Sequence, residues 1–135
     1  MKKGCKVFLA ILLSICCIYT TSLCGLAADI PTVSPQYIGV SDVFVDLSIS
    51  SSGYASCYSS AKLNNGYTGT LKMSLYREGI LVKSWSTSGS SRITLDKGYY
   101  VSSGYRYQVI ATVTVKNSSG YVVDIVTART PTQSY

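Results

Sequence analysis

The chain has 135 residues, of which 12 are Lys or Arg, six are Asp or Glu and none is His. A chain of this length forms one small domain, and the lack of His excludes imidazole-based catalytic triads and histidine metal sites. Charged residues make up 13% of the chain, about half of the usual ~25%, so catalysis by paired carboxylates has few candidate residues.

Residues 1–28 have the three parts of a secretory signal peptide. Three lysines give a positive start, an apolar run follows over residues 7–18, and small residues at Ala27 and Ala28 predict cleavage near 27/28 or 28/29. The apolar run is shorter than the ~20 residues that a membrane-spanning helix needs, so we expect the protein to be secreted. A retained membrane anchor and a lipid-modified Cys24 are the alternatives.

Removal of the signal peptide changes both the charge and the cysteine content. Three of the 12 basic residues leave with it, so nine remain against six acidic residues, a net charge of about +3. A charge this small does not favour a nucleic-acid partner. Four of the five Cys also leave, and Cys57 alone remains, so the mature chain has no disulfide within it.

Apolar and polar side chains alternate with a period of two from residue 43 onwards, which predicts β-strands. We expect seven strands, at residues 43–50, 54–63, 71–75, 80–87, 93–95, 107–115 and 121–127. We expect the turns between them at residues 51–53, 64–66, 78–79, 88–90, 96–98 and 117–120. Strands and turns at this spacing, with no helical periodicity, predict an all-β, seven-stranded antiparallel β-sandwich.

The expected domain organisation has four parts. The signal peptide at 1–28 is followed by an extended lead-in at 29–42, where prolines interrupt regular structure. The β-sandwich domain covers 43–130, and a C-terminal tail covers 131–135. A domain of this size is large enough to be held together by its core alone.

The segment from Val101 to Val109 resembles the tyrosine corner of fibronectin type III and immunoglobulin-like domains. Val101, Gly104 and Tyr107 match the spacing of that motif, although Ser103 stands where the family usually has proline. The resemblance implies that the Tyr107 hydroxyl bonds back to the backbone of the corner while its ring joins the core.

Two departures from the immunoglobulin pattern favour the fibronectin-like variant. Cys57 lies on the second expected strand, but Val109 occupies the position of the second cysteine, so the inter-sheet disulfide is missing. We expect Cys57 to be buried opposite Val109 as a small apolar residue; a reactive or intermolecular thiol is the alternative. Trp85 lies on the fourth expected strand, whereas immunoglobulin domains carry their tryptophan on the third.

The layout is also similar to a group of small secreted single-domain proteins from Gram-positive bacteria. These have an export signal, one Ser/Thr-rich sandwich, a Ser-Gly-x-Ala-x-Cys strand and a Lys-Ser-Trp-Ser segment, which correspond here to residues 52–57 and 83–86. The resemblance implies secretion and a sandwich fold, and it supplies no activity.

No catalytic residue, metal site or cofactor is expected. A serine nucleophile lacks a His to activate it, and no Lys lies in an apolar run that would lower its pKa for a Ser–Lys pair. Asp42 and Asp46 share one strand face, but calcium needs six or more oxygen ligands. The alternative to a calcium site is that Asp42 and Asp46 are exposed acidic residues that keep the strand soluble.

Tyrosine is the residue type in excess. Residues 29–135 hold eleven Tyr but one Phe and one Trp. Phe44, Tyr54 and Tyr58 are expected on the outward face of neighbouring strands, and we identify them as candidate binding residues because exposed aromatic rings stack on sugars or anchor partner proteins. The alternative is that tyrosine simply suits half-buried strand positions.

These observations predict a secreted, monomeric, non-enzymatic binding or adhesion module. Its expected partner is a protein or a glycan at the cell surface, with no nucleic acid bound and no stable membrane span after signal cleavage. A self-assembling extracellular or cell-wall structural protein, a secreted effector or antimicrobial factor, and an unrecognised hydrolase remain as alternatives.

Overall fold

The computed structural model describes residues 37–135, which form eight β-strands and no helix. The signal peptide expected at 1–28 and the lead-in as far as residue 36 lie outside the described residues. The strands are β1 (Val40–Ile49), β2 (Tyr54–Leu63), β3 (Thr68–Arg77), β4 (Ile80–Ser90), β5 (Arg92–Tyr100), β6 (Arg106–Lys116), β7 (Val122–Arg129) and β8 (Gln133–Ser134).

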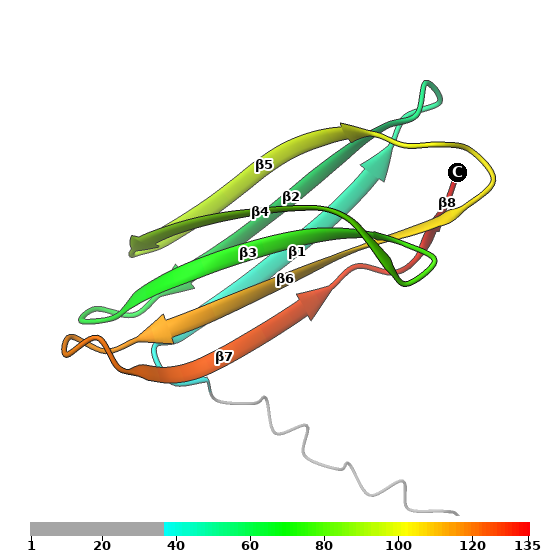
Figure 1. Ribbon diagram of the computed structural model, residues 1–135. Coiled ribbons are helices and arrows are strands. Elements are labelled where there is room, and N and C mark those ends of the chain that lie inside the picture. The colour runs from blue at the N-terminus through cyan, green and yellow to red at the C-terminus, as the bar shows by residue number, and fades with distance from the viewer. Residues whose placement is uncertain (1–36) are drawn as a thin grey trace, which may run out of the picture. The chain divides into compact units, whose positions relative to one another are not determined.

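The strands form two antiparallel sheets. One sheet has the order β1-β2-β5, and the other has the order β4-β3-β6-β7, with β8 paired to the start of β6. The strands of both sheets run in similar directions (Figure 1), as in sandwiches whose sheets are packed nearly aligned. The expected all-β sandwich is therefore confirmed, and the two-residue strand β8 is added to the seven expected strands.

The core lies between the two sheets and is built from alternate residues of the strands. In β6 the odd-numbered residues, from Tyr107 to Val115, are at most 1% exposed, while their even-numbered neighbours face outward. Cys57 of β2 is also fully buried and belongs to the same core cluster as Val109. The prediction of a buried cysteine thiol is confirmed.

The turn between β3 and β4 has the form that the sequence predicts. Glu78 and Gly79 have φ angles of 48° and 81°. Positive values at both central residues define a type I′ turn, whose twist matches that of the flanking strands. Glycine adopts this conformation freely, but Glu78 does so at a conformational cost.

Two of the expected turns are wrong. β4 continues through residues 88–90 to Ser90, and β5 continues through residues 96–98 to Tyr100. Gly89 of β4 pairs with Gly69 of β3, and the crowded position of the two is Gly69, where a Cβ would come 3.1 Å from a methyl carbon of Leu63 in the other sheet. The chain instead changes sheets at Ser91, a single residue with φ 70°.

The side-chain alternation in the last long strand predicts one face formed by Tyr121, Val123, Ile125 and Thr127, and this expectation is wrong beyond Asp124. The pairing between β6 and β7 shifts between Val115 and Lys116, so β7 contains one extra residue there. Such a bulge reverses the faces of the residues that follow. Val126 is therefore buried, whereas Ile125 is 61% exposed.

The tyrosine-corner hydrogen bond is present. The Tyr107 hydroxyl donates to the backbone carbonyl oxygen of Ser102 at 2.7 Å, and the Tyr107 side chain is buried. Tyr135, which follows β8, is tied to the same loop, because its backbone oxygen accepts hydrogen bonds from the N–H groups of Gly104 and Tyr105. The β5–β6 loop is thus held from both sides.

Candidate functional site

The outward face of the three-stranded sheet carries four aromatic side chains, which we call the aromatic face. Its members are Phe44, Tyr54, Tyr58 and Tyr100. Phe44 is 52% exposed and Tyr100 is 72% exposed. Aromatic rings are among the side chains with the most apolar area, so these exposed rings leave a large area for a partner to cover.

The three residues identified from the sequence do not form one cluster. Phe44 and Tyr58 lie together, with their ring centroids 6.0 Å apart in a tilted arrangement. Tyr54 lies four residues before Tyr58 on the same strand, a distance of ~13 Å at ~3.3 Å per residue. Between them lies Ser56, so the sheet separates the aromatic side chains into two groups.

Tyr54 instead pairs with Tyr100, which the sequence did not identify. The two rings meet edge to face with centroids 5.1 Å apart, since Tyr54 and Tyr100 are directly opposite each other in β2 and β5. The Tyr54 ring also covers Gly98, because a Cβ at Gly98 would overlap the Tyr54 hydroxyl oxygen. Gly98 is therefore the residue that lets Tyr54 lie flat against the sheet.

Acidic side chains flank the first aromatic pair. Across the sheet, Tyr58 pairs with Asp46 on one side and with Asp96 on the other. Two rows further along the same face, beyond the row of Phe44, the residues Asp42, Lys62 and Arg92 are paired in the same way, so charges of both signs meet there. The aromatic face therefore offers apolar rings beside hydrogen-bond acceptors, a mixture that suits a partner with polar groups better than a purely apolar partner.

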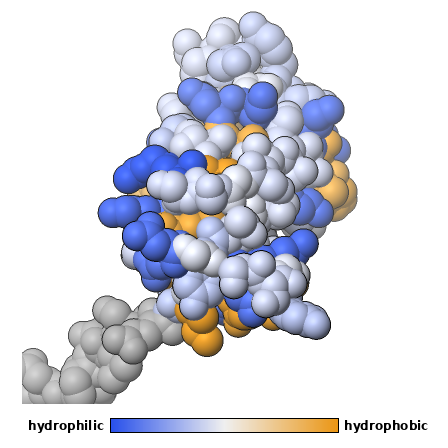
Figure 2. All heavy atoms as spheres, turned by 90° about the vertical axis from the view of Figure 1, so that its left-hand side faces the viewer, coloured by the Kyte–Doolittle hydropathy of each residue, from blue (hydrophilic) through white to orange (hydrophobic). Residues whose placement is uncertain are grey.

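The surface seen in Figure 2, which is the side at the left of Figure 1, carries no broad apolar patch. It is mostly pale or blue, and the hydrophobic residues reach it in separate small areas. The pale shade is expected for Ser, Thr and Tyr, which are abundant in the sequence. A surface of this kind is unlike the apolar patches that mark obligate interfaces.

A second candidate site, which sequence reasoning missed, is a cleft of about 520 Å³ on the outward side of the larger sheet. We call it the Tyr76 cleft, and its lining residues are Tyr76, Glu78, Gly79, Arg106, Gln108, Ile110 and Thr132. Its volume lies within the range of ~300–1,000 Å³ that small-ligand sites occupy.

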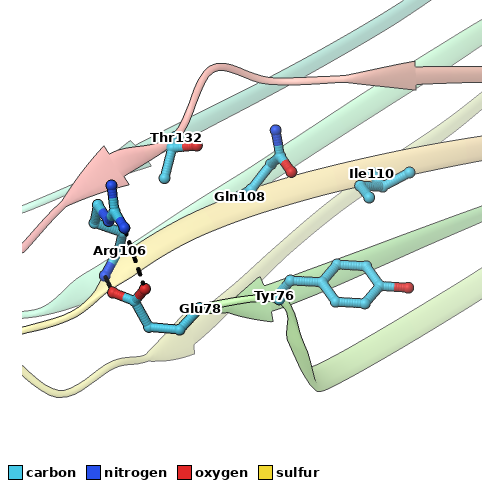
Figure 3. Close-up of a pocket in the computed structure, with 7 residues that line it drawn as sticks. Tyr76, Glu78, Arg106, Gln108, Ile110 and Thr132 are labelled. Atoms are coloured by element: carbon cyan, nitrogen blue, oxygen red, sulfur yellow. Dashed lines mark hydrogen bonds and ion pairs between the residues drawn. The ribbon is translucent and has the colours of Figure 1, made fainter.

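Figure 3 shows how three segments surround this cleft. Gln108 and Ile110 rise from β6, Tyr76 comes from the end of β3, and Thr132 lies on the segment between β7 and β8. Tyr76 and Gln108 are opposite each other in the β3–β6 pairing. The Tyr76 side chain and Ile110 are both half-buried, so the cleft has apolar surface next to its polar groups.

Polar contacts fix the side chains at one end of the cleft. The Glu78 carboxylate accepts a hydrogen bond of 2.9 Å from the backbone N–H of Arg106, and its other oxygen lies 3.6 Å from the Arg106 guanidinium. The Gln108 side-chain amide donates to the backbone oxygen of Thr130 at 2.7 Å. The Gln108 amide oxygen then remains available as an acceptor.

Two further hollows have different linings. One, of about 450 Å³, is lined by Ser, Thr and Gly residues with Lys116, and the other, of about 130 Å³, adjoins Arg77 and Tyr99. Residues 37–135 contain no group of three or more His, Cys, Asp or Glu side chains placed to hold a metal ion, and no helix able to cross a membrane.

The buried thiol is set apart from both candidate sites by its environment. Desolvation raises the pKa of Cys57 from 9.0 to about 11, so the thiol stays protonated at neutral pH. A protonated thiol is a poor nucleophile and a poor metal ligand. Cys57 therefore belongs to the core rather than to a reactive site.

The chain matches no protein-family model and no curated protein.

Proposed function

We propose that the protein is a secreted, non-enzymatic binding or adhesion module that recognises a protein or a glycan at the cell surface. The observation that carries this proposal is the aromatic face, where Phe44 and Tyr100 are more than half exposed beside acceptor groups. Ordering such rings against a partner buries a large apolar area at a low entropy cost, because an aromatic side chain has few rotatable bonds.

A fibronectin type III-like or immunoglobulin-like fold is part of the proposal. Two observations support it: the division of the strands into β1-β2-β5 and β4-β3-β6-β7, and the hydrogen bond from Tyr107 to Ser102. In a constant-type immunoglobulin domain the fourth strand joins the sheet of the first two strands. Here β4 pairs with β3 instead, which favours the fibronectin-like variant.

Secretion rests on the composition of residues 1–28, and it is tested first. The full chain is expressed in a bacterium with a general export pathway, and the protein in the medium is analysed by mass spectrometry. We expect a mature chain that begins at residue 28 or 29. A chain that keeps its first residue and stays with the cells contradicts the proposal.

Binding is tested with the protein recovered from the medium, labelled with a fluorophore, on purified bacterial cell walls. The variants Phe44→Ala and Tyr58→Ala remove the first aromatic pair, and Tyr54→Ala removes the second. We expect each pair to contribute, with a loss of binding of roughly tenfold or more if the rings act as anchors. Protease treatment of the walls distinguishes a protein partner from a glycan.

The matched control is Tyr121→Ala. Tyr121 is 72% exposed, like Tyr100, but it lies in the β6–β7 connection rather than on the aromatic face. The proposal requires that this variant binds like the unaltered protein. Equal losses in all variants, or no wall binding by the unaltered protein, would refute it.

A second candidate function, self-assembly into an extracellular structure, is favoured by the edge strand β4. This strand has 11 residues and lies at the edge of its sheet, with Lys83 as its one charged side chain. Long edge strands with few charges can pair with another chain. If β4 pairs with a second copy of the chain, sedimentation should show oligomers that grow with concentration, and Ser86→Lys should abolish them. If β4 does not pair, the unaltered protein should show no oligomers.

A further inference from the structure

Three irregularities of the backbone meet at the Tyr76 cleft. The β3–β4 pairing shifts between Leu75 and Tyr76, Glu78 has a positive φ of 48°, and the chain between β7 and β8 leaves the sheet beside β6. Bulges often redirect a side chain at a functional site, and strained residues cluster at such sites. The cleft is therefore formed by departures from regular sheet structure, not by a gap between ideal strands.

The strained turn position of Glu78 is accompanied by contacts of its side chain with Arg106. An Asn, Asp or Gly would suit the first position of a type I′ turn better. Glutamate there has a side chain long enough to reach the Arg106 backbone and guanidinium. The result is a carboxylate and a guanidinium side by side at the end of the cleft, which together present hydrogen-bond acceptors and donors.

The charges of the lining residues cancel. Arg106 and Glu78 are the charged members of the lining set, and they are paired with each other. An anionic ligand would have to compete with Glu78 for Arg106, and a cationic ligand would have to compete with Arg106 for Glu78. The electrostatics favour a neutral ligand with several polar groups.

The remaining lining groups add an apolar surface and further polar atoms. Tyr76 and Ile110 supply the apolar area, and the Gln108 amide oxygen and the Thr132 hydroxyl provide polar atoms beside it. Gln108 and Ile110 are neighbours on β6, between Tyr76 and Thr132 (Figure 3). A pyranose has one apolar face of C–H groups and a rim of hydroxyls that each donate and accept. Its two kinds of surface match the two kinds of lining.

We propose that the Tyr76 cleft binds one neutral sugar residue of a glycan, with the sugar ring against Tyr76 and its hydroxyls bonded to Glu78, Arg106 and Gln108. The inference rests on the proposed binding function only in taking a glycan as a partner. Its site lies on the opposite sheet from the aromatic face, so the two can fail separately.

The test is an NMR titration of the isotope-labelled protein with four probes: methyl glucoside, N-acetylglucosamine, glucuronate and a tripeptide of alanine. We expect at least one neutral sugar to shift the backbone signals of residues 76–79 and 106–110 and the side-chain amide of Gln108. Concentrations up to ~50 mM detect even millimolar binding. Shifts caused by glucuronate or the peptide but by neither neutral sugar overturn the inference, as does the absence of shifts with all four probes.

Variants separate this site from the rest of the surface. Glu78→Gln keeps the side-chain length and removes the charge, and Gln108→Ala removes an acceptor. Each is expected to lower the affinity for the sugar that binds by roughly tenfold or more. Tyr100→Ala, on the other sheet, is expected to leave sugar binding unchanged. Equal affinities in the cleft variants and the unaltered protein contradict the inference. If wall binding survives while no sugar binds, this inference fails alone; if the sugar binds while wall binding fails, the proposed function fails alone.

Discussion

The hydroxyl of Tyr107 donates a hydrogen bond to the backbone carbonyl oxygen of Ser102, five residues earlier, at 2.7 Å. We expect Tyr107→Phe to lower the free energy of unfolding by about 1 kcal/mol, the usual net value of one such bond. The ring and its packing are retained, so the change isolates the hydroxyl. Urea unfolding followed by Trp85 fluorescence measures the difference.

The control for this change is Tyr105→Phe. Tyr105 is 41% exposed, and its ring lies 4.6 Å from the Arg77 guanidinium, a contact that phenylalanine keeps. The free energy of unfolding of the Tyr105→Phe variant is expected to stay within about 0.5 kcal/mol of that of the unaltered protein. Equal effects of the two substitutions would mean that the Tyr107 bond contributes nothing specific.

Cys57 is expected to resist thiol reagents in the folded protein. Its side chain is fully buried, and desolvation raises its pKa to about 11. A rise of two units lowers the thiolate fraction roughly 100-fold at pH 8, before burial slows access further. Labelling with iodoacetamide should therefore begin only when denaturant unfolds the chain, and rapid labelling of the native protein would show that Cys57 is accessible.

The same pKa shift makes a prediction about alkaline pH. The unfolded thiol has a pKa of about 9, and the folded thiol has a pKa of about 11, so between these values the unfolded chain binds fewer protons. Stability then falls as pH rises from about 9 to about 11, and the contribution is fully present below pH 9. Other groups titrate in this range, so the free energy of unfolding is measured for both the unaltered protein and Cys57→Ala. The difference between the two free energies should narrow as pH rises.

Gly98→Ala is expected to displace the Tyr54 ring. An added Cβ would overlap the Tyr54 hydroxyl oxygen, so the ring must leave the sheet and give up its edge contact with Tyr100. We expect a loss of roughly 1–3 kcal/mol from this overpacking. If that explanation is right, Gly98→Ala should cost much less in a Tyr54→Ala background, and additive effects in the double-mutant cycle would count against it.

Ser59 is expected to tolerate loss of its hydroxyl. The side chain is fully buried, and its oxygen has no hydrogen-bond partner within residues 37–135. Because a buried unsatisfied hydroxyl destabilises the folded state, Ser59→Ala should leave stability unchanged or raise it by up to about 1 kcal/mol. A clear loss of stability in thermal unfolding would indicate a bonded hydroxyl.

Much of the fold follows from side-chain alternation, and the exceptions have local causes. The alternation in β6 predicts its buried residues because β3 pairs with it in regular register throughout, and β7 does so from Ile110 to Val115. Turn prediction fails at residues 88–90 because glycine usually interrupts strands, whereas here Gly89 lies opposite Gly69 beneath side chains of the other sheet. That juxtaposition depends on the packing of two sheets, which a single strand does not reveal.

The candidate sites show a similar division. Alternation places Tyr54 and Tyr58 on one face, but the register with β5 decides that Tyr54 meets Tyr100. The Tyr76 cleft brings together segments more than 50 residues apart in the sequence, from Tyr76 to Thr132. Its one visible signal was Glu78, a residue poorly suited to the first position of a tight hairpin turn.

Because Ser91 alone separates β4 from β5, the two sheets are mechanically coupled at that corner. The other connection between the sheets at the same end, from β2 to β3, has four residues, 64–67, and can absorb movement. A force that peels β4 from β3 is transmitted through Ser91 to β5 and from there to β2. Lengthening this link with flexible residues would let one sheet slip against the other, and resistance to pulling would fall even if every core contact were kept.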